Sequence, residues 1–228
     1  MRKWGIIVSL LYALIVVGLL VPGLAVLSGY STPSSPSFLS DMKSLFALWM
    51  VWVPIGILVC GQVVLLFLSV DTSQKRLKPR APILVSYTVT AMLFALLTFA
   101  ALSSLGAAVY SDKFIDRFWP TETYVIVAWA ILWLLWGIVF LLFFRNSNVP
   151  TTRLVSWLLK GSVLELLIAV PCHVIVRRRS DCSAPVATSF GIATGVAVML
   201  LSFGPSVLLL YKKRLDAYAA RKTDQGNL

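Results

Sequence analysis

Long apolar runs alternate with short polar connections along the whole chain. The six runs cover residues 4–27, 45–70, 82–109, 123–144, 154–176 and 184–211. Each is close to or above the roughly 20 residues that an α-helix needs to cross a bilayer, and well above the roughly 10 residues of a barrel strand. Lipid offers no partners to backbone N–H and C=O groups, so runs of this length must be helices. The pattern predicts an all-α integral membrane protein: a bundle of about six transmembrane helices forming one polytopic membrane domain over residues 1–228.

The first run follows directly after Met1, Arg2 and Lys3, and a secretory signal peptide begins in the same way. The apolar part of a signal peptide is usually about 7–15 residues long, however. This run is much longer, so we expect it to be retained as the first transmembrane helix.

The composition agrees with a membrane protein. Hydrophobic residues make up 59% of the chain and charged residues 13%, whereas soluble domains carry about 25% charged residues. The formal net charge of +11 raises nucleic acid as a partner. Lys and Arg also flank transmembrane helices because positive loops are kept in the cytoplasm. We therefore expect a lipid bilayer, and no nucleic acid, as the partner of these charges.

The distribution of the charges predicts the orientation. With the N-terminus inside, thirteen Lys and Arg residues fall on the cytoplasmic side and six on the other, as the positive-inside rule requires. The thirteen are Arg2, Lys3, Lys75, Arg76, Lys78, Arg80, Arg145, Arg153, Lys212, Lys213, Arg214, Arg221 and Lys222, and the six are Lys43, Lys113, Arg117, Arg177, Arg178 and Arg179. We expect an N-in/C-in protein of the cell (plasma or inner) membrane, with a basic cytoplasmic tail at 212–228.

One carboxylate lies within the apolar runs. Glu165 is about halfway along the fifth run, where an ionised carboxylate costs roughly 2.5–3.5 kcal/mol. It must therefore be neutral, paired or beside a wet cavity. Lys160 lies about 140° away around the helix, so the two side chains do not pair. Glu165 is a candidate ligand-binding or transport residue, or a neutral acid hydrogen-bonded to another helix.

Thiol and imidazole groups gather at the end of the same run. Cys172 and His173 follow Pro171, which removes a backbone hydrogen bond and bends the helix, and Cys182 lies in the following loop. A disulfide between Cys172 and Cys182 and two free thiols both remain open. The three side chains lack a fourth protein ligand for a structural zinc site, so we expect no metal. A redox role of Cys172, His173 and Cys182 stays as a hypothesis.

Three consecutive arginines, Arg177–Arg179, lie on the side where the positive-inside rule expects fewest. Guanidinium groups bind phosphate and carboxylate groups through paired hydrogen bonds. The cluster therefore predicts binding of an anionic ligand, a lipid phosphate or the acidic surface of another membrane subunit. Contact with headgroups alone is the simpler interpretation.

Two helical patterns indicate packing. Trp129, Trp133 and Trp136 recur at i, i+4 and i+7 along the fourth run and form one stripe. The stripe would suit stacking on a flat cofactor or a quinone, and equally packing against neighbouring helices or lipid; no cofactor is identified by it. Gly191 and Gly195 form a GxxxG pair in the sixth run, which allows close helix packing within the bundle.

Catalytic motifs are absent: the chain has no HExxH, no P-loop and no GxSxG element. The single His excludes a haem held by two His ligands of this chain. The first hypothesis is a non-catalytic or accessory subunit that binds an anionic lipid, ligand or partner at its outer face. The alternatives are a small-solute or anion transporter that uses Glu165, and a membrane redox protein that uses Cys172, His173 and Cys182.

Overall fold

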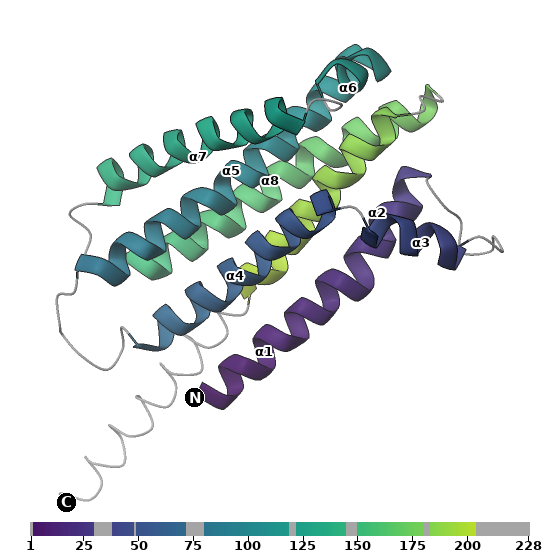
Figure 1. Ribbon diagram of the computed structural model, residues 1–228. Coiled ribbons are helices and arrows are strands. Elements are labelled where there is room, and N and C mark those ends of the chain that lie inside the picture. Colours follow the sequence, from purple (N-terminus) through teal and green to yellow (C-terminus); the bar gives the residue numbers. More distant parts are fainter. Residues whose placement is uncertain are drawn as a thin grey trace, which may run out of the picture.

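The structure, a computed structural model, describes residues 2–29, 38–47, 49–71, 80–118, 122–144, 150–179 and 183–203. Nearly all of this part of the chain is helical and none of it is a strand (Figure 1). The all-α prediction is therefore confirmed for these residues. The predicted basic tail at 212–228 and the end of the sixth run, 204–211, lie outside the described residues.

The helices follow one another in the order of the apolar runs. Their bounds are α1 Arg2–Ile15, η1 Val16–Leu20, α2 Val21–Ser28, α3 Phe38–Ala47, α4 Trp49–Asp71, α5 Arg80–Tyr110, α6 Asp112–Phe118, α7 Glu122–Phe144 and α8 Pro150–Arg178. The last described helix, Ala184–Phe203, carries no label and is called the 184–203 helix below.

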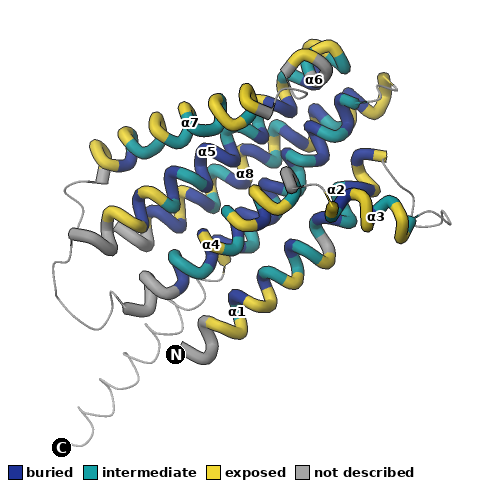
Figure 2. The backbone as a smooth tube through the Cα atoms, viewed as in Figure 1, coloured by how far each residue is buried: buried dark blue, intermediate teal, exposed yellow. Residues whose placement is uncertain are grey.

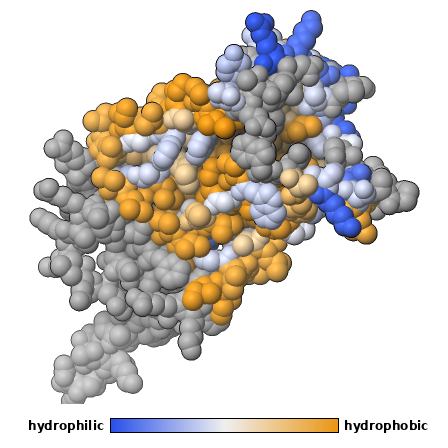
Figure 3. Space-filling view, viewed as in Figure 1, coloured by the Kyte–Doolittle hydropathy of each residue, from blue (hydrophilic) through white to orange (hydrophobic). Residues whose placement is uncertain are grey.

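Five helical stretches are long and apolar enough to cross a membrane. They are Ile6–Ser28, Leu84–Tyr110, Thr123–Phe143, Arg153–Arg178 and Ala184–Phe203, and they fall on the first, third, fourth, fifth and sixth predicted runs. This set of helices is what a multi-pass membrane protein requires. In the space-filling view, apolar side chains cover the flank of the bundle and hydrophilic ones gather at one end (Figure 3).

The second predicted run, 45–70, differs from the structure. Its first residues belong to α3, and α3 and α4 meet at an angle of 73°. Helix α3 contains the charged residues Asp41 and Lys43, and charged side chains oppose the burial of a helix in lipid. The Trp52 indole N–H donates a hydrogen bond of 2.9 Å to the Phe46 carbonyl, so it satisfies one of the carbonyls that the end of α3 exposes. The bend is therefore stabilised by a side chain of the next helix.

Helix α5 and the 184–203 helix occupy the centre of the bundle. In each of these two, 56% of the apolar stretch is buried, against 6% in α7 and 24% in the first stretch. Helix α5 packs against α4, α7 and α8, and the colouring by burial shows α7 and α1 at the two sides (Figure 2). The exposed side chains of α7 are large and apolar, which suits contact with lipid chains.

The first helix contains one π-helical turn. Between α1 and α2, the five residues of η1 place the Val21 N–H on the Val16 carbonyl, one residue further than an α-helix would. Pro22 follows in the first turn of α2, and its ring nitrogen has no proton for the Gly18 carbonyl. The loss of that bond explains why the wider turn forms here. Further along the chain, the Tyr12 hydroxyl donates to the Ala197 carbonyl at 3.0 Å and ties α1 to the 184–203 helix.

Three helices end at the same end of the bundle. We call it the arginine end: it carries Gly29 after α2, Tyr110 at the end of α5, and Arg177–Arg179 at the end of α8 (Figure 1). The short helix α6 folds back on α5 here. A Cβ at Gly106 would lie 2.6 Å from Cζ of Phe114, so the ring fills the space that the glycine leaves.

A carboxylate from α6 caps the start of the 184–203 helix. One oxygen of Asp112 accepts hydrogen bonds of 2.9 Å from the Ser183 N–H, the Ser183 hydroxyl and the Ala184 N–H. Backbone N–H groups at a helix start have no partner within the helix, and a negative charge there is favourable. Asp112 is 71 positions from Ser183 in the sequence, so this cap also joins two distant parts of the chain.

Replacing Asp112 with Ala should destabilise the folded protein by about 1–2 kcal/mol, because the helix start loses its acceptor. Asp112→Asn keeps an acceptor oxygen and should lose less. The measurement is the thermal unfolding midpoint in mild detergent. Equal midpoints for wild type and Asp112→Ala would contradict the capping role.

Candidate functional site

The Glu165 carboxyl group lies between three central helices. Its side chain is 2% exposed and points from α8 at the glycine pair of the 184–203 helix. A Cβ at Gly195 would overlap Oε2 of Glu165, and a Cβ at Gly191 would lie 3.1 Å from Oε1. Ser104 of α5 lines the same notch, because its Oγ would also meet a Cβ at Gly191. The GxxxG pair therefore packs inside the bundle, against a carboxyl group.

Neither carboxyl oxygen of Glu165 has a hydrogen-bond partner among the residues that the structure describes. The neighbouring Ser104 hydroxyl donates to the Ala100 carbonyl of its own helix at 2.9 Å. Lys160, on the same helix as Glu165, is exposed. Buried polar groups normally have a partner, and this carboxyl group is an exception, as are buried atoms of Ser9, Gln62, Thr90 and Trp129 within the described residues.

Cys172 and His173 diverge from each other on α8. Cys172 is buried among small residues, packed with Ala107, Ala184 and Ala187. His173 instead shares a 2.8 Å hydrogen bond between its Nδ1 and the Thr188 hydroxyl of the 184–203 helix. Cys182 lies outside the described residues, so its pairing with Cys172 and a redox role for the three stay predictions.

The tryptophan stripe packs largely against α5. The Trp133 indole N–H donates to the Thr88 carbonyl at 3.2 Å, and that of Trp136 to the Thr98 hydroxyl at 2.9 Å. Trp129 stacks on Trp133 with the ring centres 5.8 Å apart. These contacts support helix packing as the role of Trp133 and Trp136. Trp129 borders an apolar cavity, described below.

Two of the three arginines reach the ends of other helices. Nη1 of Arg179 donates a 2.6 Å hydrogen bond to the Ala108 carbonyl in the last turn of α5. Nη1 of Arg177 lies 3.0 Å from the position that a Cβ would take at Gly29, the residue that ends α2. A cation is favourable at the negative end of a helix dipole, and three such ends meet here. This arrangement gives a structural reason for arginines at this position.

All three arginine side chains remain exposed. Arg177 and Arg178 form no hydrogen bond or ion pair with any residue in the described ranges. Their guanidinium donors are therefore free of the protein groups described here, whereas Arg179 uses one of its donors on the backbone. Of the predicted cluster, Arg177 and Arg178 are therefore the pair without a partner among the described residues.

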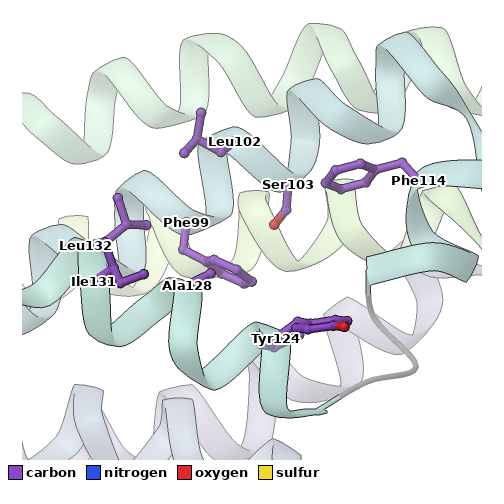
Figure 4. Close-up of a pocket in the computed structure, with 9 residues that line it drawn as sticks. Phe99, Leu102, Ser103, Phe114, Tyr124, Ala128, Ile131 and Leu132 are labelled. Carbon is purple, nitrogen blue, oxygen red and sulfur yellow. The ribbon is translucent and has the colours of Figure 1, made fainter.

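Two apolar cavities lie on either side of Phe99. The first, of about 360 Å³, lies between α5, α6 and α7, and the hydroxyl oxygens of Ser103 and Tyr124 are the polar atoms of its wall in Figure 4. The second, of about 340 Å³, is lined by the first helix and by α3, α4, α5, α7 and the 184–203 helix. Neither cavity includes Glu165 in its wall.

The predicted site residues therefore do not converge on one centre. Glu165 lies in the middle of the bundle, the arginines lie at its end, and the tryptophans lie between α7 and α5. No sequence pattern indicated the Asp112 cap, the Ser104 contact or the two cavities. Each depends on residues that are far apart in the chain. The only signal in the sequence was the presence of polar Ser and Asp residues at these positions.

Replacing Gly195 with Ala should destabilise the bundle by about 1–3 kcal/mol, because the new methyl group would overlap the Glu165 carboxyl group. The control is Gly137→Ala on α7, where a Cβ meets nothing within 4 Å. The control should be neutral or stabilising by up to about 1 kcal/mol, since Ala favours helix. Thermal unfolding in mild detergent measures the stability of both variants. Equal changes in the unfolding midpoint would contradict the close contact between Gly195 and Glu165.

The chain matches no protein-family model, no curated protein and no solved structure. Its function is therefore inferred from its own residues and their geometry.

Proposed function

We propose that this protein is a non-catalytic membrane component that binds an anionic lipid, ligand or partner subunit at its arginine end. The observation that carries the proposal is the pair Arg177 and Arg178, exposed and without a described partner. Arginine binds phosphate and carboxylate through two parallel hydrogen bonds. The absence of known catalytic motifs from the sequence supports a binding role rather than an enzymatic one.

The proposed topology has six crossings, with both termini in the cytoplasm. Helix α4 supplies the sixth crossing: its 23 residues extend about 35 Å at 1.5 Å per residue, enough for a hydrocarbon core of about 30 Å. An even number of crossings brings both termini to one side, and the excess of Lys and Arg then falls in the cytoplasm. The arginine end faces outward in this arrangement, at a plasma or inner membrane.

The test is to remove both of these arginines together, as Arg177→Gln with Arg178→Gln. Arg179 is kept because it bonds the backbone of α5. An arginine near a membrane surface contributes about 1 kcal/mol toward anionic lipid, so the double variant should bind the anionic component about 30-fold more weakly. The measurement is the mass of the lipids and proteins that co-purify in mild detergent.

The matched control is Lys113→Gln with Arg117→Gln on α6, which removes two exposed charges from the same end. It should keep the anionic component. If the arginine variant also keeps it, or if both variants lose it equally, the arginine pair is not the binding site.

A second candidate is a carrier that uses Glu165, favoured by the burial of that carboxyl group without a described partner. An intramembrane carboxylate is a common element of proton and ion pathways. The two cavities stop short of Glu165, which is why this candidate ranks second.

The carrier predicts that Glu165→Gln abolishes flux, because the amide has nearly the same shape but carries no charge. The measurement is proton uptake into vesicles containing the purified protein, followed with an enclosed pH dye under an imposed gradient. Uptake that equals that of empty vesicles, or that is the same for wild type and Glu165→Gln, would eliminate the carrier. Under the binding proposal, Glu165→Gln should retain the anionic component at the wild-type level.

A further inference from the structure

We propose that the second apolar cavity holds an acyl chain of one anionic phospholipid, whose phosphate is bound by Arg177 and Arg178. The inference rests on the proposed function and specifies its ligand. The cavity and the arginine pair would act together, with one part selecting the chain and the other the headgroup.

The wall of the cavity suits a hydrocarbon chain. It is almost entirely apolar, with side chains such as Leu20, Leu58, Leu96 and Phe190 around it. A polar solute placed there would lose its hydrogen bonds to water and find almost none in return. The volume of about 340 Å³ lies in the range of ligand pockets, about 300–1,000 Å³.

The dimensions suit a single acyl chain better than a protein helix. A helix with side chains is at least about 10 Å wide. A cavity of about 340 Å³ would therefore hold only about three helical residues. A flexible chain enters such a space without displacing the surrounding helices. In a bilayer, acyl chains are also the apolar molecules at highest concentration.

The cavity opens toward lipid. Val53 of α4 and Ile126 of α7 both line it, and they are 45% and 49% exposed. Helices α4 and α7 each pack on α5 but hardly touch each other over the described residues. The gap between them is thus a lateral mouth through which a chain can enter from the bilayer.

The cavity also reaches the arginine end. Leu24 of α2 lines it, and Gly29, beside the Arg177 guanidinium, follows five residues later. Five helical residues rise about 7.5 Å. Val186, in the first turn of the 184–203 helix, lines the cavity from the other side. A chain in the cavity could therefore place its polar end next to the Arg177 guanidinium, and Arg178 is the next residue of α8.

The π-helical turn forms part of the same wall. Val16 and Leu20, the first and last residues of η1, both border the cavity. Single π-turns within helices are often found at functional sites, because the extra residue widens the helix locally. Here the widened turn faces the space that the chain would occupy.

The headgroup supplies the selectivity. Lipid chains and leucine side chains are about equally apolar, so burial of a chain inside a membrane brings little hydrophobic gain. All phospholipids could offer such a chain. The two guanidinium groups would favour those with a net negative headgroup, so binding should discriminate by charge.

The experiment is native mass spectrometry of the full-length protein in mild detergent with equal amounts of phosphatidylglycerol and phosphatidylcholine of identical chains. Wild type should retain one phosphatidylglycerol and bind it about tenfold more tightly than phosphatidylcholine, because the guanidinium groups favour the headgroup with a net negative charge. Soluble glycerol phosphate at the same concentration should not compete. Equal retention of the two lipids, or full competition by glycerol phosphate, would overturn the proposal.

Two variants address the chain directly. Ala193→Phe fills the cavity from the 184–203 helix, and Val53→Trp narrows its mouth at an exposed position. Both should lose the retained lipid while Arg177 and Arg178 are intact. Ala128→Phe, which fills the first cavity instead, is the control and should keep it. Size-exclusion profiles identify variants that fail to fold, and Val53→Trp provides the test if Ala193→Phe does.

The arginine variant separates the two proposals. If Ala193→Phe and Val53→Trp keep phosphatidylglycerol while Arg177→Gln with Arg178→Gln loses it, the anion site stands and the acyl-chain site is wrong. If the arginine variant also keeps its preference for phosphatidylglycerol, both proposals are wrong. For a chain in the cavity, the arginine variant should bind phosphatidylglycerol more weakly than wild type does, and no better than it binds phosphatidylcholine.

Discussion

The close approach of helices at Gly191 and Gly195 is the contact around which the bundle is organised. Apolar side chains gain little by leaving lipid for a helix interface, so association in a bilayer depends on tight packing. The two glycines let α8 and α5 bring Glu165 and Ser104 against the backbone of the 184–203 helix. The remaining helices attach to this centre: α7 and α4 pack on α5, and α1 packs on α4 and is tied to the 184–203 helix by the Tyr12 hydroxyl.

Electrostatic contacts of helix ends stabilise the arginine end. Asp112 meets the positive start of the 184–203 helix, while Arg179 meets the negative end of α5. Both follow from the same macrodipole, with opposite sign. The arginine run therefore has a structural component in Arg179, and under the proposed function the donors of Arg177 and Arg178 are the ones that bind the anion.

Hydropathy alone predicted most of the helices. The runs 82–109 and 123–144 correspond to α5 and α7 within two residues at each end, because lipid demands both length and apolarity. The second run differed from the structure, because its first apolar residues form the end of α3 and a bend separates them from α4. Glu165 could be singled out by its charge, but its glycine notch could not. The notch, the Asp112 cap and the cavities arise from residues distant in sequence, for which a single chain carries no local signal.

The π-turn of the first helix has a consequence for how this chain tolerates insertions and deletions. A π-turn contains one residue more than an α-turn, so loss of one residue from Val16–Leu20 removes the extra residue and keeps the faces of α1 and α2 in phase. Loss of a residue between Tyr12 and η1 would instead rotate everything before it by about 100° and turn Tyr12 away from Ala197. The wall of the cavity is thus the place where the length of this helix is most free to vary.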